Sequence, residues 1–406
     1  MTLRLKHVAQ LIAGQSPASE GVTPLSGVAL PFLQGNAEFG REVPSPIHEC
    51  AVSPKRCKRD DVLVSVRAPV GALNIADQRY GIGRGLAALR PIPSFADARF
   101  VWWWMHSQVD RLRAEATGST YTAITVEDLG ALPFPTLPLD EQRRIADFLD
   151  AETGRMDLLM DLRQTHRSLV AEKLNSRRAE ALSGPTSDAV SHPILGRIAG
   201  HWPVRRVKEV VTRVGVGVVV NPSSYFVDEG VPFLLGNNVR EDTIDLTNVR
   251  YMSSANSALL HRSRLEAGDV VVVRAGYPGR AAVIPPDLAG ANCASILLLK
   301  RPTLVLPEWL SLFFNSPQGK AQVAVAQYGA AQEQINVGDV IDFQLPVPPL
   351  EIQGAVLAQL AEASERQRQI VGCIDQQLNL ARERRQALIT AAVTGRLDVT
   401  TARGAA

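Results

Sequence analysis

A chain of 406 residues with 46% hydrophobic and 21% charged residues has the composition of a globular protein built from two to four domains. Its formal net charge of only +2 excludes a polycation that holds nucleic acid through bulk charge, so any such contact has to come from local clusters. No apolar run approaches the roughly 18 residues of a membrane span, and the opening Met1-Thr2-Leu3-Arg4-Leu5 lacks a signal-peptide pattern. We therefore expect a cytoplasmic protein that contacts no membrane.

The first 138 residues have the pattern of a mixed α/β domain. Short β-type runs bounded by Gly, Pro and Asp are expected at 62–66 and 87–89. Residues 98–105 predict a helix that ends at Ser107. Its three consecutive tryptophans, 102–104, could stack on bases, but we expect them to lie mainly in the core.

A long helix is predicted at 139–184. Pro138 lies just before its start, Asp140 suits the positive N-terminal end of the helix dipole, and Gly184 suits a C-terminal cap. About 45 residues would span roughly 65–70 Å at 1.5 Å per residue. An interrupted, coiled-coil-like apolar stripe is expected along it. This stripe consists of Ile145, Leu149, Met156, Leu159, Met160, Val170 and Leu174.

The same order of elements then follows a second time. A second mixed α/β domain is expected at 185–349, entered through a linker at 185–201 that is rich in Ser, Pro, Gly and His. Its expected elements are strands at 270–273 and 296–299 and a helix at 308–314 that ends at Ser316.

A second long helix is predicted at 350–395, which leaves a C-terminal tail at 396–406. Its stripe includes Leu357, Leu360, Ile374 and Leu378. Alone each stripe would be unstable, so we expect the two long helices to pack antiparallel as a spacer. The predicted fold class is α/β (α+β), with two globular domains separated by two antiparallel, coiled-coil-like helices.

The two halves are copies of one module. The matching anchors are Leu139 with Leu350 and Gly184 with Gly395, each pair 211 residues apart, Pro31 with Pro232, and Asp61 with Asp269. The match also predicts that Arg67 and Arg274 occupy the same place after matching strands. A repeat this long predicts a pseudo-twofold arrangement of two domains and two helices rather than a solenoid.

Polar and Arg-bearing loops on both copies are the candidates for DNA contact. Arg suits guanine edges and phosphates, Asn and Gln suit adenine, and Lys and hydroxyl groups hold phosphates. The candidates in the first copy are Gln34, Asn36, Arg41, Lys55, Arg56, Lys58, Arg59, Arg67, Arg84, Ser119, Thr120 and Tyr121. Those in the second copy are Asn237, Asn238, Arg240, Arg250, Arg262, Arg264, Arg274, Tyr277, Arg280, Gln332, Gln334 and Asn336.

The search for catalytic chemistry finds no complete motif. The chain has no GxxxxGK[ST] phosphate loop, and the glycine-rich run at 81–85 lacks the helix that would follow in a cofactor site. The four cysteines show no CxxC spacing, and His48, Cys50 and Cys57 lack a fourth ligand. No Ser/His/Asp set stands out, so we predict no catalytic residues, no metal site and a binding role.

Two helix motifs resemble a known family. The first is Leu137-Pro138-Leu139-Asp140-Glu141-Gln142-Arg143-Arg144-Ile145-Ala146, and the second is Arg384-Arg385-Gln386-Ala387-Leu388-Ile389-Thr390-Ala391-Ala392-Val393-Thr394-Gly395. Together with the repeated Phe-Leu-x-Gly-Asn segments, they resemble the specificity subunit of type I restriction–modification systems. The resemblance covers essentially the whole chain, with a departure at Ile352, which stands where the first copy has Glu141.

The resemblance implies that residues 1–138 and 185–349 are target-recognition domains, each reading one half of an asymmetric bipartite site in double-stranded DNA. It implies that the helices fix the gap between the half-sites and dock two modification (methyltransferase) subunits. Those subunits would carry S-adenosylmethionine, and restriction (helicase-nuclease) subunits that use ATP and Mg would join for cleavage. The chain itself would bind no cofactor and hold no active site.

Two alternatives of other classes stay open at this point. One is a self-contained DNA-modifying enzyme, a methyltransferase or nuclease with a degenerate motif, which would methylate or cut DNA without a partner. The other is a stand-alone DNA-binding adaptor or regulator, which would lack any modification partner.

Overall fold

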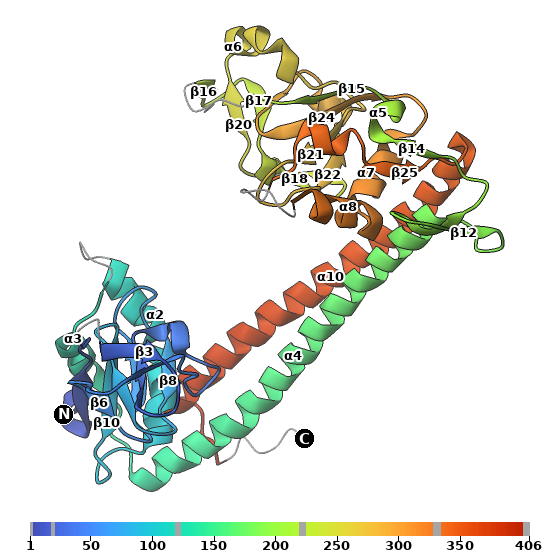
Figure 1. Ribbon diagram of the computed structural model, residues 1–406. Coiled ribbons are helices and arrows are strands. Elements are labelled where there is room, and N and C mark those ends of the chain that lie inside the picture. The colour runs from blue at the N-terminus through green and yellow to red at the C-terminus, as the bar shows by residue number, and fades with distance from the viewer. Residues whose placement is uncertain (1–2, 18–20, 118–122, 219–224, 328–333, 401–406) are drawn as a thin grey trace. The chain divides into compact units, whose positions relative to one another are not determined.

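The computed structural model describes residues 3–17, 21–117, 123–218, 225–327 and 334–400, which fold as two compact units. The first unit comprises residues up to 164 together with those from 374 onward, and the second comprises 165–373. Each unit contains one globular domain, called copy one and copy two below, and the adjoining parts of two long helices (Figure 1). This division cuts both helices, so neither domain is independent of them.

Copy one is built on an antiparallel sheet in the order β2-β10-β7-β8. Its strands are β2 (Ala9–Ala13), β10 (Leu86–Pro91), β7 (Val62–Ser65) and β8 (Leu73–Ile75). Both faces are covered, which explains why β7 reads as a continuous apolar run rather than an alternating one. Val62 and Val64 lie in the core shared with α2 (Ala98–Thr117), whereas Leu63 lies in a second core on the opposite face.

The second core lies against a mixed sheet in the order β3-β5-β4-β9-β6. Its strands are β3 (Val22–Pro24), β5 (His48–Cys50), β4 (Leu30–Leu33), β9 (Tyr80–Ile82) and β6 (Arg56–Cys57). β4 and β9 run parallel, with Leu33 opposite Ile82, and both side chains are buried. The remaining elements are β1 (Leu3–Arg4), α1 (Leu5–Val8), η2 (Asn36–Glu38), α3 (Val126–Ala131) and β11 (Pro133–Phe134).

Helix α2 confirms the expected burial of the tryptophans, since Trp102, Trp103 and Trp104 are each 2% exposed. The predicted end of this helix at Ser107 is wrong, because α2 continues to Thr117. The hydroxyl of Ser107 donates to the carbonyl of Trp104 and so is satisfied inside the helix. Serine therefore does not end the helix here.

Copy two repeats this architecture. Its antiparallel sheet has the order β15-β24-β21-β22 and its mixed sheet the order β16-β20-β17-β23, with β17 and β23 parallel as β4 and β9 are. The strands are β15 (Val211–Val216), β24 (Ile296–Pro302), β21 (Val270–Val273), β22 (Ala281–Val283), β16 (Phe226–Val227), β20 (Arg250–Met252), β17 (Val231–Leu234) and β23 (Asn292–Cys293). Side chains of β21 again alternate between two cores. The predicted repeat is thus present in three dimensions.

Copy two is completed by short elements around these sheets. They are β14 (Val204–Arg206), α5 (Val207–Val210), η4 (Gly236–Asn238), β18 (Val239–Arg240), β19 (Thr243–Ile244), α6 (Ser254–Leu259), η5 (His261–Ser263), η6 (Pro286–Leu288), α7 (Pro307–Asn315), α8 (Pro317–Gln327), α9 (Val337–Val340) and β25 (Gln344–Pro346). Helix α7 ends before Ser316, as predicted.

The predicted linker at 185–201 is not merely a connection. It folds into an antiparallel hairpin of β12 (Ala189–His192) and β13 (Gly196–Ala199). Leu195 and Ile198 from this hairpin are buried in the core of the second unit. The polar composition of this segment therefore did not predict that two of its apolar side chains are buried.

The long helices are α4 (Leu139–Ser183) and α10 (Leu350–Val393), close to the predicted bounds. Gly184 and Gly395 each have φ of +70°, the left-handed conformation of a C-terminal cap. In the first unit the start of α4 packs beside the end of α10, since Ile145 and Val393 share one core. In the second unit Gln367 of α10 donates to the carbonyl of Val170 of α4. The two helices lie side by side and antiparallel within each unit (Figure 1).

Equivalent glutamines tie each domain to the helix that follows it. Gln142 is 1% exposed; it accepts from the Asp97 amide and donates to the carbonyl of Phe95. Gln353, 211 residues later, accepts from the Leu306 amide and donates to the carbonyl of Leu304. The Gln of each helix-start motif therefore fixes the junction between domain and helix.

The apolar stripe was predicted only in part. Ile374 and Leu378 are buried, as expected of a helix seam. Leu159, assigned to the stripe of the first helix, is instead 58% exposed, and its neighbours Leu158 and Leu162 are exposed as well. In this part of α4, copy one and α10 cover a face of the helix that does not include Leu159.

Candidate nucleic-acid interface

Four strands of copy one end at the same edge, and polar side chains follow them. β4 and β9 end together because the Gly83 amide donates to the carbonyl of Leu33. Gln34, directly after β4, donates to the hydroxyl of Ser16, which follows β2. The Val66 amide, after β7, donates to Gly85. The copy-one strand-end cluster therefore consists of Ser16, Gln34, Asn36, Arg67 and Arg84.

Glycines make this convergence possible. A Cβ on Gly83 would lie 2.8 Å from Oε1 of Gln34, and one on Gly85 would lie 2.9 Å from the Gln34 carbonyl oxygen. The glycine-rich run at 81–85 is thus explained by close backbone approach. Gln34, Arg67 and Arg84 are exposed, so their amide and guanidinium groups face solvent at the edge of the domain.

The corresponding edge of copy two carries a different set of side chains. The Ala294 amide donates to the carbonyl of Leu234, so β17 and β23 end together. The Ile335 amide donates to the carbonyl of Arg274, which joins the end of β21 to the segment after residue 333. Arg274 also donates from Nη2 to Oδ1 of Asn336 at 2.8 Å. The copy-two strand-end cluster consists of Asn237, Arg274, Tyr277, Arg280, Gln334 and Asn336.

The turn between β21 and β22 gives this cluster an aromatic surface. Gly276 and Gly279 have φ of +82° and +87°, conformations that favour glycine. Between them Tyr277 is 60% exposed, and the guanidinium of Arg280 lies 3.8 Å from the centroid of its ring. Such an Arg–Tyr stack offers a flat face, a cation and a hydroxyl to nucleic acid.

The predicted equivalence of Arg67 and Arg274 is wrong by one residue. In copy one the Ile124 amide donates a hydrogen bond to the carbonyl of Val66. In copy two the amide of the matching Ile335 donates to the carbonyl of Arg274. Arg67 therefore matches Ala275. Because neighbouring side chains of an extended segment point to opposite faces, the two arginines do not occupy the same place. Both still lie in their own strand-end clusters.

The other predicted residues are spread over each domain. Lys55 and Arg56 lie with Gln10 to Ala13 of β2 around a groove of about 560 Å³, and Lys58 and Arg59 are exposed nearby. In copy two Arg262 is exposed on η5 and the guanidinium of Arg250 lies 6.0 Å from the ring centroid of Phe226. Ser119, Thr120, Tyr121 and Gln332 lie outside the described residues.

Three predicted residues use their side chains within the protein. Asn238 is 2% exposed; its amide donates to the Asp245 carbonyl and accepts from the Leu235 amide, so it cannot read a base. Arg240 pairs with Asp245 at 3.1 Å. Arg41 pairs with two carboxylates of α4.

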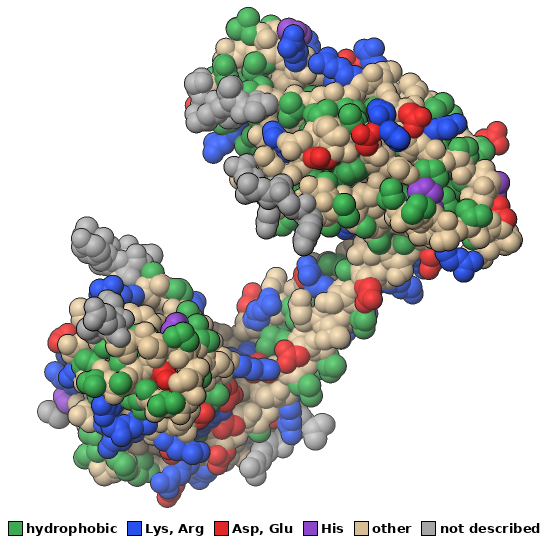
Figure 2. Space-filling view, viewed as in Figure 1, with side chains coloured by type: hydrophobic (Ala, Val, Ile, Leu, Met, Phe, Trp, Pro, Cys, Tyr) green, Lys and Arg blue, Asp and Glu red, His purple; other side chains and the backbone are tan. Residues whose placement is uncertain are grey.

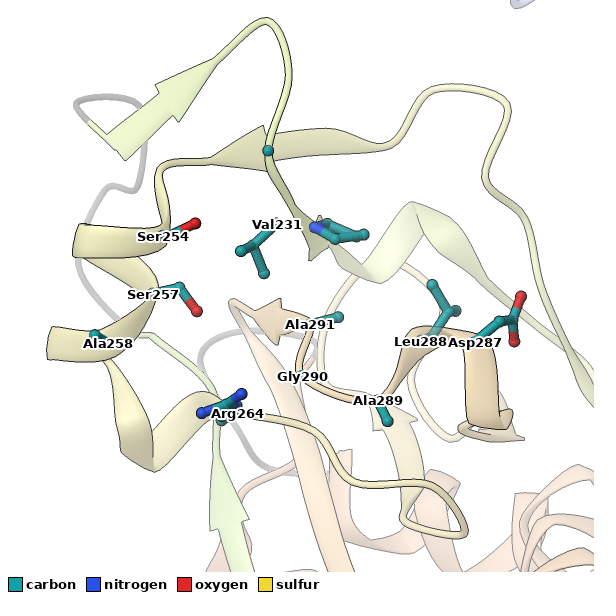
Figure 3. A pocket seen from close by; sticks show the side chains of 12 residues that line it. Val231, Ser254, Ser257, Ala258, Arg264, Asp287, Leu288, Ala289, Gly290 and Ala291 are labelled. Carbon is teal, nitrogen blue, oxygen red and sulfur yellow. The ribbon is translucent and has the colours of Figure 1, made fainter.

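Arg264 lines a pocket of about 410 Å³ in copy two. Figure 3 shows Arg264 below Ser254 and Ser257 of α6 and opposite the loop that carries Gly290. The pocket combines the guanidinium of Arg264 and the carboxylate of Asp287 with apolar walls such as Val231. A donor and an acceptor together suit the edge of a base better than a phosphate.

Sequence reasoning missed Ser16, and also Ser295, which follows β23. Ser16 lies two residues after Gly14, whose amide donates to Leu86, as the amide of the matching Gly217 donates to Ile296. Ser295 matches Arg84, since Ala294 and Gly83 donate to the matching carbonyls of Leu234 and Leu33. The serines carry no motif of their own, and only the fold brings them to the strand ends.

The described part of the chain also has features that bear on metal and thiol chemistry. It contains no group of three His, Cys, Asp or Glu side chains that could hold a metal ion. Burial raises the pKa of the thiols of Cys57 and Cys293 to about 12, so neither is a nucleophile near neutral pH. Among the helices that the structure describes, none has the length and apolar character to cross a bilayer. On the face in Figure 2, cationic and anionic side chains are interspersed on both units.

Comparison with known proteins agrees with this picture. Residues 52–164 match the family model of the type I restriction modification DNA specificity domain. The chain is 35% identical over 161 residues to the type I restriction enzyme MjaX specificity subunit of Methanocaldococcus jannaschii, covering 40% of this chain and 37% of that protein. It is 20% identical over 279 residues to the EcoBI specificity subunit of Escherichia coli, covering 65% and 58%. These matches span less than two thirds of the relatives' own length.

A solved structure shares the fold along nearly the whole chain. A chain from a structure that describes complex assembly and conformational transition of a type I R-M system has a TM-score of 0.72 and 19% identity, covering 98% of both chains. Residues 52–164 are therefore similar to the type I restriction modification DNA specificity domain, and nearly the whole chain shares the fold of a chain from a type I R-M system.

Proposed function

We propose that this chain is the DNA specificity subunit of a type I restriction–modification complex. Copy one and copy two each read one half of an asymmetric bipartite site in double-stranded DNA. The observation that carries the proposal is the repeated strand-end edge, built on one scaffold but bearing different side chains in each copy. A common scaffold positions the two clusters alike, while Gln34 and Arg84 in one and Tyr277 and Asn336 in the other present different donors and acceptors to bases.

The chain contributes binding rather than catalysis in this proposal. Two modification subunits would supply S-adenosylmethionine and transfer its methyl group to adenine, and restriction subunits would supply ATP- and Mg-dependent cleavage. The exposed Leu158, Leu159 and Leu162 of α4 support docking of a modification subunit on the helices, because adjacent exposed leucines on a helix favour a protein partner. The similarity of residues 52–164 to the type I DNA specificity domain favours this interpretation over a self-contained enzyme or a stand-alone adaptor.

The test is assembly-dependent DNA binding. Electrostatic contacts to phosphates dominate affinity for DNA, and neither cluster is strongly basic, so the chain alone should bind weakly. With modification subunits at two per chain, binding at the same salt concentration should become tight and specific for one bipartite sequence. Equal affinity and equal specificity with and without the partner would overturn the proposal.

A further inference from the structure

One position of the hairpin that follows the Phe-Leu-x-Gly-Asn segment has opposite charges in the two copies. The hairpin is closed alike in both, since the Ser45 amide donates to Glu38 and the Asp245 amide donates to Asn238. This correspondence places Glu241 where copy one has Arg41. A cation in copy one is therefore replaced by a carboxylate at the same position in copy two.

In copy one the hairpin is held to α4 by a cation on the domain. Arg41 lies 3.3 Å from a carboxylate oxygen of Asp157 and 3.0 Å from one of Asp161. Hydrogen bonds to Asp161 and then to Asp157 raise the pKa of this guanidinium above its usual value. Arg99 of α2 makes a parallel contact, with its Nε 2.8 Å from Asp150. These five residues form the copy-one clamp.

In copy two the cation lies on the helix instead. Arg178 of α4 is 5% exposed and its two Nη groups pair with Glu241 and Asp242. Lys320 also lies 2.8 Å from Glu241. Burial opposes ionisation, yet hydrogen bonds from Lys320 and Arg178 hold the pKa of Glu241 below its usual range. Asn315 donates to Asp242 at 2.7 Å. Arg178, Glu241 and Asp242 form the copy-two clamp.

The helix pair does not repeat the charges on which the clamps depend. At the 211-residue offset, Arg368 stands where the first helix has Asp157, and Ala361 stands where it has Asp150. The position matching Arg178 is Ile389, which is fully buried in the apolar core of the first unit. Glu308 takes the place of Arg99 on the domain, since α7 and α2 match with Ser316 opposite Ser107. Charge thus differs between the copies on both sides of the contact.

We propose that the charges of the two clamps make each domain fit only its own end of the helix pair. The end that holds copy one is called the first seat, and the end that holds copy two the second seat. The positioning residues are Arg41, Arg99, Arg178 and Glu241. Copy two placed in the first seat would bring Glu241 and Glu308 toward Asp157 and Asp150. Copy one placed in the second seat would bring Arg41, in place of Glu241, toward the buried Arg178, with Glu42 at the position of Asp242 as the one remaining carboxylate. Like charges at a contact oppose association, and a buried charge that exchanges one of its partners for a like charge is destabilised.

The first test reverses one charge in the full-length chain. Arg41→Glu should lower the midpoint of thermal unfolding of the first unit by about 2–4 °C, because this pair is partly exposed. Spin labels at positions 59 and 151, in a chain with Cys373→Ser, should show a broader distance distribution between domain and helix. Adding Asp161→Arg should restore both the midpoint and the narrow distribution.

Arg79→Glu is the matched control, since it makes the same charge change at an exposed site of copy one outside the clamp. An Arg41→Glu chain that behaves like this control, or a double variant without rescue, would overturn the proposal. A role in stability alone would lower the midpoint without broadening the distances.

The second test exchanges the domains directly. A chain with copy two in both seats should unfold at a lower temperature than the same chain carrying Glu241→Arg and Glu308→Arg in the first seat. Equal midpoints with and without these two substitutions would show that charge does not decide which domain fits which seat. Neither test involves DNA, so failure here would be distinguishable from failure of the proposed function.

Discussion

His106 should make the stability of the first unit depend on pH. It lies on α2 with its ring centroid 4.6 Å from that of Trp102 and 5.5 Å from that of Trp103. Its Nε2 is buried and has no hydrogen-bond partner in the part of the chain that the structure describes. Burial, and then the nearby charges of Arg385 and Arg99, lower the pKa of His106 to about 4.

The size and sign of the effect follow from linkage. An unfolded histidine has a pKa of about 6.5, so between about pH 6.5 and 4 the unfolded chain binds a proton that the folded chain does not. The free energy of unfolding of the first unit is therefore at its full value above about pH 6.5 and decreases as the pH falls from about 6.5 to 4. At about 1.4 kcal/mol per pH unit, the loss of unfolding free energy comes to about 3 kcal/mol.

Native-state hydrogen exchange of the α2 amides across pH 4–7.5 measures the opening free energy of this region. The variant His106→Asn introduces the residue found at the matching position 315 and should remove the extra pH dependence. His261→Asn, at an exposed site of copy two, is the control and should leave the α2 amides unchanged. Identical pH dependence in the parent chain and the His106→Asn variant would refute the reasoning.

Two further predictions concern DNA. In the complex with modification subunits, Arg274→Ala should weaken specific binding by about 1–3 kcal/mol, whereas Arg205→Ala, at an exposed arginine of copy two outside the cluster, should have little effect. Equal loss on specific and unrelated DNA, with a shallower salt dependence, would show that Arg274 contacts phosphate rather than a base. Inserting four residues after Arg163 and after the matching Ile374 lengthens each helix by roughly 6 Å and nearly keeps the phase of its faces. At about 3.4 Å per base pair, the preferred gap between half-sites should widen by one or two base pairs, and an unchanged gap in a well-folded variant would mean that the helices do not set it.

The long helices were predictable because their signals are local. Apolar spacing extends over many turns, and the caps Gly184 and Gly395 lie at the matching ends. The buried strands were predictable for a similar reason, since Val270 to Val273 form a continuous apolar run that only a sheet covered on both faces requires. Each of these features is decided by residues close in sequence.

The details of the site depend instead on register and on distant partners. A one-residue difference between the copies separates Arg67 from the position of Arg274, and no sequence pattern marks it. Asn238 has the composition of a base reader but is used by the hairpin, because its partner Asp245 closes the loop around it. The clamp at Arg178 joins residues more than sixty positions apart, so neither charge reveals its role in the sequence.

Sequencing of the adenine methylome tests the central claim most directly. A host carries the complete system, first with this chain and then with residues 1–138 replaced by the matching domain of a relative. The account predicts one asymmetric bipartite methylated site for the parent chain, and a change of one half-site only for the replacement. A change in both half-sites, or in neither while methylation continues, would contradict the claim that each copy reads its own half.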